Sequence, residues 1–406
     1  MPDGTTVPQV VVEGTANPDA DDIGGHLPRA RRRLNAGSAR EVGLAVALLL
    51  VWMVLQRTTD GLFLTPRNLS NLSIQFSVTA ILAVGIVVVM TAAEIDLSAS
   101  ATVGLCAILV ARLTTDHGLN VWVAIAATLV FGLLIGVWHG VWVTVANVPS
   151  FITTLASLLG LGGLALVITD GQTTVVPDSL TFVANRYLPS WSVALLGVVV
   201  TLAVLALRWR ELRLRETVGM DRRAGTTAVV PVLVTAGIAT FAIYVFGSYR
   251  GLPLPVLILG VVAGVVAFVL RFSVFGKHVV AVGTDPEASR RAGIRVRWIR
   301  TAPFVLMGLL YGVAALIFVS RLGGAPAQGM VGEELNVIAA AVLGGTSLFG
   351  GVSRIGGAVV GALLMESLSN GMVLMNVNSF WQRVVVGAML LLAVAVDVNL
   401  RRRSNG

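Results

Sequence analysis

The chain has 406 residues, of which 56% are hydrophobic and 12% are charged, and its formal net charge is +8. Soluble domains carry about 25% charged residues, so this composition excludes an ordinary soluble protein. Its apolar runs reach or approach the ~20 residues that a helix needs to cross a bilayer. Backbone polar groups in lipid must be satisfied within the segment, so such runs predict helices. We expect an all-α fold, a polytopic transmembrane helical bundle.

The positive charge gathers in short arginine clusters beside apolar runs, as at Arg401, Arg402 and Arg403. Clusters in that position are typical of the cytoplasmic ends of membrane spans. The sequence has no basic, soluble module of the kind that binds nucleic acid, so we expect contact with membrane lipid and none with nucleic acid. Its one cysteine, Cys106, excludes an intramolecular disulfide and a cysteine metal cluster, and we expect no metal.

Three regions follow one another along the chain. Residues 1–40 are polar, end near an arginine cluster and are predicted to be a disordered cytoplasmic tail. Residues 41–399 form the transmembrane domain, and residues 400–406 a basic cytoplasmic tail. When the spans are counted from a cytoplasmic N-terminus, the arginine-rich loops after the sixth and eighth spans lie on the same side of the membrane as the C-terminal arginine cluster. Both termini are therefore predicted to be cytoplasmic. We expect about twelve spans, at 42–55, 72–92, 98–113, 120–145, 152–169, 190–207, 227–246, 252–270, 302–319, 335–350, 356–375 and 380–397.

Two of the apolar regions are interrupted. Residues 85–105 contain Glu94 and Asp96 in an otherwise apolar stretch, and residues 338–364 are broken repeatedly by glycine. Both regions could be broken helices that meet near mid-membrane and expose helix termini to a substrate. Glycine also lets membrane helices pack closely, and for the second region both interpretations stay open.

A short polar stretch at residues 281–297 lies between two apolar runs and has the signals of a small helix. Asp285 suits the N-cap, Pro286 the first helical position and Glu287 the first turn. Gly293 is placed to end the helix in the left-handed region. About two turns are too short to be stable alone, so this segment either docks on another protein or is a solvated loop helix.

Several motifs, in one order, resemble a known family. They lie at residues 93–98, 148–155, 276–294, 343–352, 370–372 and 380–382. With them, the sequence from about residue 40 onward resembles the permease subunits of bacterial ATP-binding-cassette (ABC) importers for ribose, xylose, arabinose and galactosides. The additional region 178–250 makes it most similar to the xylose type.

The resemblance implies that the chain forms the sugar path of an importer in the bacterial cytoplasmic (inner) membrane. The implied partners are an ABC ATPase subunit, a periplasmic or lipid-anchored sugar-binding protein, and a second permease copy in a homodimer. The sequence has no GxxxxGK[ST] phosphate loop, so we expect that the chain is not an enzyme and has no cofactor. ATP is expected to be bound by the partner subunit. The cytoplasmic coupling loop is residues 276–300. Its expected ATPase-coupling residues are Gly283, Asp285, Pro286, Glu287, Ala288, Arg290 and Gly293.

Membrane-embedded polar residues are the candidates for the sugar path, since a charge at the bilayer centre costs from ~2.5 kcal/mol upward. Asp96 could meet sugar hydroxyls, or it could cap a helix that starts at Leu97. Ser150 could likewise be an N-cap. The full candidate set is Glu94, Asp96, Ser98, Asn147, Ser150, Thr153, Thr154 and Ser347.

Two functions of other classes were weighed against the importer. An ion-coupled secondary transporter would use Glu94 and Asp96 as a proton relay and would leave the 285–293 helix without a role. An integral membrane enzyme would need a convergent nucleophile, base or set of metal ligands, and the four histidines are not paired at ligand spacing.

Overall fold

The computed structural model describes residues 27–217 and 225–405, so most of the expected N-terminal tail lies outside the described residues. The chain divides into two units, residues 1–42 and residues 43–406. In the first unit, the described residues are the beginning of helix α1. The second unit contains the helical bundle.

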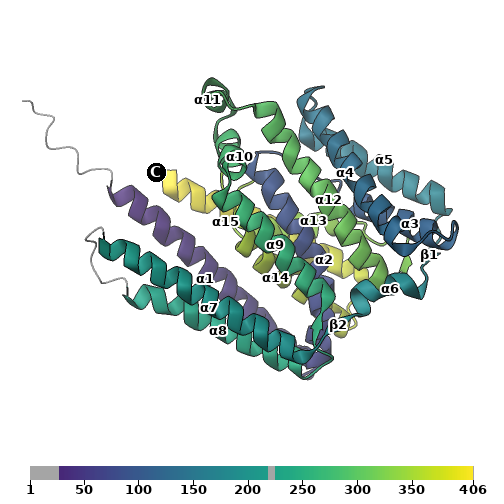
Figure 1. Ribbon diagram of the computed structural model, residues 1–406, viewed down its shortest axis with the longest axis horizontal. Helices are drawn as coiled ribbons and strands as arrows, with labels where there is room; N and C mark the ends of the chain where they lie inside the picture. Colours follow the sequence, from purple (N-terminus) through teal and green to yellow (C-terminus); the bar gives the residue numbers. More distant parts are fainter. Residues whose placement is uncertain (1–26, 218–224, 406) are drawn as a thin grey trace, which may run out of the picture. The chain divides into compact units, whose positions relative to one another are not determined.

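The described residues are almost entirely helical (Figure 1). The long helices of the first half are α1 (Leu27–Thr58), α2 (Pro66–Thr91), α3 (Ala99–Thr115), α4 (Val121–Thr144), α5 (Ser150–Thr169), α7 (Ser190–Thr217) and α8 (Gly225–Gly247). The second half has α9 (Leu254–Phe272), α12 (Val296–Leu322), α13 (Glu333–Leu343), α14 (Ile355–Leu374) and α15 (Ser379–Asn405). Shorter helices are α6 (Asp178–Asn185), α10 (Val274–Thr284) and α11 (Pro286–Arg291).

Two pairs of very short strands tie connecting segments together. Strand β1 (Thr174–Val175) pairs antiparallel with β4 (Gly324–Ala325), and β2 (Tyr187–Leu188) pairs antiparallel with β3 (Leu252–Pro253). Each pair joins segments far apart in the sequence at one end of the bundle.

Within the described residues, six helices are long and apolar enough to cross a membrane: α2, α4, α5, α9, α12 and α14. Five shorter apolar stretches lie in α1, α3, α7, α8 and α15. Together with α13, these helices coincide with the twelve intervals expected from the sequence. The prediction of a membrane helical bundle is therefore consistent with the fold, and the number of crossings stays a prediction.

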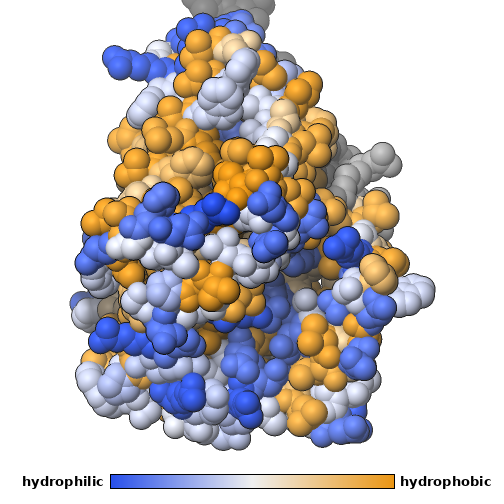
Figure 2. Space-filling model, turned by 90° about the vertical axis from the view of Figure 1, so that its right-hand side faces the viewer, coloured by the Kyte–Doolittle hydropathy of each residue, from blue (hydrophilic) through white to orange (hydrophobic). Residues whose placement is uncertain are grey.

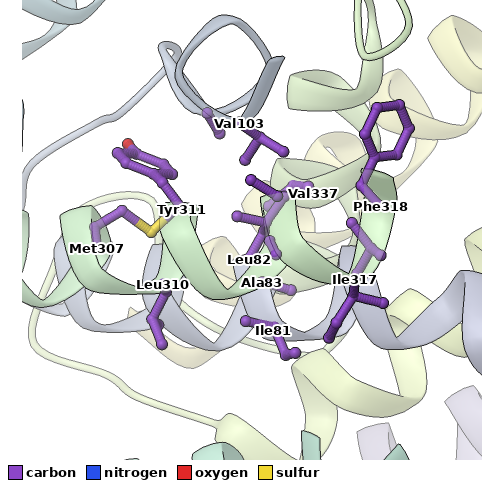
Figure 3. Packing of buried hydrophobic residues seen from close by; sticks show 14 of the residues in the cluster. Ile81, Leu82, Ala83, Val103, Met307, Leu310, Tyr311, Ile317, Phe318 and Val337 are labelled. Atoms are coloured by element: carbon purple, nitrogen blue, oxygen red, sulfur yellow. The ribbon is translucent and has the colours of Figure 1, made fainter. Parts of the chain in front are cut away.

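Helices α2 and α12 form the centre of the second unit. The apolar stretch of α2 is 89% buried and that of α12 is 72% buried, whereas those of α4, α5 and α9 are 22–28% buried. The central cluster joins Leu82 of α2, Ile317 of α12 and Val337 of α13 (Figure 3). On the side of α5 and β1, hydrophobic residues gather over the upper middle, and below them hydrophilic residues lie among smaller hydrophobic patches (Figure 2). A helix that is apolar all round fits the buried centre. The apolar side chains that the outer helices expose are the ones expected to face lipid.

Helices α4 and α12 touch through their backbones. A side chain at Gly132 would collide with the carbonyl oxygen of Gly308, and one at Gly136 would collide with that of Phe304. Small residues allow such close approach between membrane helices, and the contact gains van der Waals energy along both backbones. This packing fixes α12, which begins directly after the polar segment at 285–295.

Both interrupted regions are broken helices, as the sequence suggested. Helix α2 ends at Thr91 and α3 begins at Ala99, while α13 ends at Leu343 and α14 begins at Ile355. The glycines of the second region also serve packing: Gly344 and Gly357 lie so close that neither has room for a side chain. That region therefore shows both a break in the helix and close packing, and the exposure of its helix termini to a substrate stays a prediction.

Candidate coupling and translocation site

Helix α11 has the capping that the sequence predicts. Asp285 is its N-cap, and the Asp285 Oδ1 atom accepts hydrogen bonds from the backbone N–H groups of Glu287 and Ala288, both at 2.9 Å. Pro286 occupies the first turn, and Gly293 follows the helix with a φ of 83°. The helix is six residues long, shorter than the two turns expected, so its cap and its contacts with neighbouring elements hold it in place.

One side of α11 is exposed and the other is anchored. Pro286, Glu287, Ala288 and Arg290 are exposed, whereas Ser289 is buried. Next to it, Val279 and Val282 of α10 pack with Ala92, Val296 and Ile299 in a separate small apolar cluster. Six of the seven expected coupling residues are therefore exposed on an element that is fixed from beneath, and Gly283 is buried.

The exposed surface around α11 is mainly basic. Arg290, Arg291, Arg295 and Arg297 are exposed there, and Glu287 pairs with Arg291 at 3.6 Å. Trp298, at the start of α12, is 63% exposed. An exposed tryptophan among arginines is the composition of a protein contact surface, because Trp and Arg carry much of the binding energy at interfaces.

The C-terminal end of α10 meets both interrupted regions through backbone atoms. The Gly351 N–H donates a hydrogen bond to the Thr91 carbonyl oxygen at 3.0 Å. Gly283 lies against the same two residues: a side chain there would collide with the Thr91 oxygen and would come within 3.0 Å of the Gly351 nitrogen. Gly350, with a φ of 85°, is in turn packed on the Gly283 oxygen.

Glu94 and Asp96 are held by protein groups in the segment between α2 and α3. The Glu94 carboxylate forms an ion pair with Arg300 of α12. Asp96 Oδ1 accepts from the Ser98 N–H at 2.8 Å and from its hydroxyl at 2.7 Å, and Oδ2 accepts from the Tyr311 hydroxyl. The alternative that Asp96 caps a helix starting at Leu97 was wrong: α3 begins at Ala99 with Ser98 in the cap position, and no side chain caps it. Asp96 instead closes a local turn by accepting from the N–H two residues on.

Ser150 and Thr154 of α5 are brought to the same segment. The expectation that Ser150 is the N-cap was wrong: α5 begins at Ser150 with Pro149 in the cap position. The Ser150 hydroxyl instead accepts from the Ile95 N–H at 3.1 Å, and Thr154 donates to the Ser150 carbonyl oxygen at 2.8 Å. A hydroxyl in this position satisfies the backbone of a non-helical segment that is shielded from water.

The other candidate path residues lie in different settings. Asn147 is exposed in the loop before α5, with a φ of 54°. Thr153 is buried, and its hydroxyl has no hydrogen-bond partner. Ser347 is buried in the loop between α13 and α14, where its hydroxyl accepts from the Phe349 N–H at 3.0 Å. The structure therefore gathers Glu94, Asp96, Ser98, Ser150 and Thr154 at the segment between α2 and α3, in separate contacts with Arg300, with Tyr311 and with the Ile95 backbone, and leaves Asn147 outside.

Sequence reasoning missed several polar residues in the bundle. Arg300 and Tyr311, the partners of Glu94 and Asp96, gave no signal because an arginine at a span start and a tyrosine within a span are ordinary there. Glu366 of α14 is 4% exposed and accepts a hydrogen bond from the Thr79 hydroxyl of α2. Nearby, Asn68 donates to the Asn370 side chain at 2.9 Å. An acid inside the apolar run at 356–375 was the signal that could have identified Glu366.

Comparison with known proteins defines the class of the chain. A family model described as "Branched-chain amino acid transport system / permease component" matches residues 68–394. The chain belongs to this family of transport-system permease components, as the resemblance implied. No solved structure matches it.

Among curated proteins, the chain is similar to sugar permeases over almost its whole length. It is 42% identical to the xylose transport system permease protein of Escherichia coli (strain K12) over 364 residues, 89% of this chain and 91% of the relative. It is 33% identical to the ribose import permease protein of the same organism, over 86% of this chain and 91% of the relative. It is 30% identical to the L-arabinose ABC transporter permease protein of Azospirillum brasilense, over 87% of this chain and 86% of the relative.

Proposed function

We propose that the chain is the membrane-spanning permease subunit of an ATP-driven importer for xylose or a related pentose or hexose, in the bacterial cytoplasmic membrane. A separate ABC ATPase subunit binds ATP, a periplasmic or lipid-anchored protein delivers the sugar, and a second permease copy completes a homodimer. The family membership and the relatives named for xylose, ribose and L-arabinose support this proposal.

The observation that carries the proposal is the exposed, capped helix α11. It presents Glu287, Ala288 and Arg290 to solvent, while the element beneath it is packed against α2 and α12. A short helix held in this way can dock in a groove of a second protein and transmit the movement of that protein to the bundle. The surrounding arginines favour an ATPase groove rimmed with acidic side chains, by electrostatic complementarity.

The sugar path in this proposal runs past the segment between α2 and α3. The hydroxyls of Ser98, Ser150 and Thr154 are engaged by protein groups, so they shape the path in this conformation. The Thr153 hydroxyl is buried and unpartnered, which makes it the group of this set best placed to bind a sugar hydroxyl when the site opens.

The test is association with the ATPase. Purified permease is mixed with its ATPase subunit, and the bound fraction is compared between the native protein, Glu287→Arg and the control Asp178→Arg. Asp178 is exposed at the start of α6 and undergoes the same charge change far from α11 in the sequence. Loss of ATPase binding in Glu287→Arg alone supports the proposal, and unchanged binding in both variants contradicts it.

The second candidate, an ion-coupled transporter, has no observation in its favour. Glu94 is 3% exposed and paired with Arg300, and Asp96 is 1% exposed and accepts from Ser98 and Tyr311. A proton relay needs a carboxylate that can exchange protons with water or with another acid. The relatives described above are all permease components of transport systems.

A further inference from the structure

Three segments far apart in the sequence meet mainly through backbone atoms, with the Thr284 side chain lying against Gly351. They are the end of α10 at Gly283, the end of α2 at Thr91, and the loop between α13 and α14 at Gly350 and Gly351. The Gly351 N–H binds the Thr91 oxygen at 3.0 Å, and Gly283 lies on both of these atoms. Gly350 lies on the Gly283 oxygen and would place a Cβ 2.7 Å from that of Ala93. We call these four residues, Thr91, Gly283, Gly350 and Gly351, the glycine junction.

The glycine junction lies directly next to the coupling helix. Gly283 is two residues before Asp285, which caps α11 from an extended conformation with a φ of −152°. Its neighbour Val282 is fully buried in the small apolar cluster with Ala92 and Val296. A displacement of α11 therefore reaches Gly283 through two intervening residues, and the buried valine ties the end of α10 to the neighbouring segments.

The glycine junction also touches both broken helices. Thr91 is the last residue of α2 and precedes the segment with Glu94 and Asp96, and Gly351 precedes α14. Close-packed backbone atoms transmit displacement, because they have no flexible side chain that could absorb it by changing rotamer. Packed contacts of this kind shift between discrete arrangements and do not deform continuously.

We propose that the glycine junction is the point at which movement of the coupling helix is divided between the two broken helices, so that α2 and α14 change together. Gly283 and Gly351 are positioning residues in this scheme, and neither contacts sugar or nucleotide. The inference rests on the proposed function, because it assumes that an ATPase moves α11. What the inference adds is the route by which movement passes from α11 to α2 and α14. It also adds that this route requires glycine, a residue without a side chain, at position 283.

The test compares Gly283→Ala with Gly264→Ala in the complex of permease, ATPase and binding protein in proteoliposomes. Gly264 is an exposed glycine of α9 with nothing within 4 Å of the position of a Cβ. A Cβ at Gly283 forces the α2 and α13–α14 segments away from α10, so we expect ATPase binding and hydrolysis to persist while uptake falls by about tenfold or more. Gly264→Ala keeps native uptake. Native uptake in a folded Gly283→Ala complex overturns the proposal.

A measurement on the native complex covers the case in which Gly283→Ala does not fold. Hydrogen exchange is followed with and without a trapped, non-hydrolysable nucleotide. We expect exchange to change in residues 344–354 and 92–98 together with residues 281–292. A change confined to residues 281–292 overturns the glycine junction. Failure of the importer proposal itself is distinct, because the native complex would then show no ATPase-dependent uptake.

Discussion

Buried acids in this protein are compensated one by one. Glu94, which is almost fully buried, pairs with Arg300, and Asp96 accepts hydrogen bonds from Ser98 and Tyr311. Glu366 accepts one from Thr79. An uncompensated charge at membrane depth is costly, so removing one partner is expected to cost more than the pair contributes.

The Arg300–Glu94 pair gives the first prediction. Arg300→Ala leaves the Glu94 carboxylate buried without its partner, and we expect the free energy of unfolding to fall by about 2 kcal/mol, since Arg300 is partly exposed. Arg291→Ala breaks the exposed pair with Glu287 and should change the free energy of unfolding by less than ~0.5 kcal/mol. Denaturant unfolding in detergent measures both. Equal losses in the two variants would show that burial does not decide the value of these pairs.

The hydrogen bond between Tyr311 and Asp96 gives the second prediction. Tyr311→Phe keeps the ring in the core and removes the hydroxyl that donates to the Asp96 carboxylate. A hydrogen bond to a charged acceptor is worth about 2 kcal/mol, and we expect a loss of that order in unfolding free energy. Tyr244→Phe is the matched control, because Tyr244 is 61% exposed. A Tyr311→Phe protein as stable as this control would contradict the assigned role.

At the scale of elements, signals within a few residues were reliable and contacts between distant segments were not. The N-cap at Asp285 and the left-handed Gly293 follow from local sequence, and both are present. The start of α5 was misjudged because Ser150 has an alternative partner, the Ile95 N–H, which only the fold brings near it. Likewise, the glycines at 344–357 left open whether a helix is interrupted or closely packed, and they could not indicate which segments meet there.

The contact between α4 and α12 gives a prediction at this scale. Gly136→Ala puts a methyl group into the Phe304 carbonyl oxygen, so the two helices must separate, and we expect a loss of roughly 3 kcal/mol in unfolding free energy. Gly160→Ala, on α5 with nothing within 4 Å, should be close to neutral. The comparison uses thermal or denaturant unfolding of both variants in one detergent. A neutral Gly136→Ala would mean that α4 is not packed on α12 in this way.

At the scale of the whole molecule, hydropathy and arginine placement predicted the class and the order of helices. Each of the twelve intervals expected from the sequence overlaps a described helix. Hydropathy could not show that α2 and α12 are buried among other helices while α4, α5 and α9 are not, because all five are apolar. That distinction depends on which helices pack together, and periodicity is lost when every face is apolar.

The orientation of the chain is tested by labelling. The arginine clusters predict that Asp178 lies outside and Trp298 inside. An impermeant thiol reagent added to intact cells should label Asp178→Cys and should label Trp298→Cys only after permeabilisation. Native Cys106 is buried and serves as the unlabelled background. Labelling of Trp298→Cys in intact cells would reverse the orientation and move α11 away from any cytoplasmic ATPase.

The central claim is that an ATPase drives sugar transport through this chain, and uptake by proteoliposomes tests it most directly. The permease is reconstituted with its ATPase and binding protein, and labelled xylose uptake is measured with ATP inside, without ATP, and with a proton gradient alone. The account predicts uptake that requires both ATP and the ATPase and that is lost in Glu287→Arg. Uptake that persists without the ATPase and follows the proton gradient would contradict it and would make Glu94 and Asp96 the centre of the mechanism.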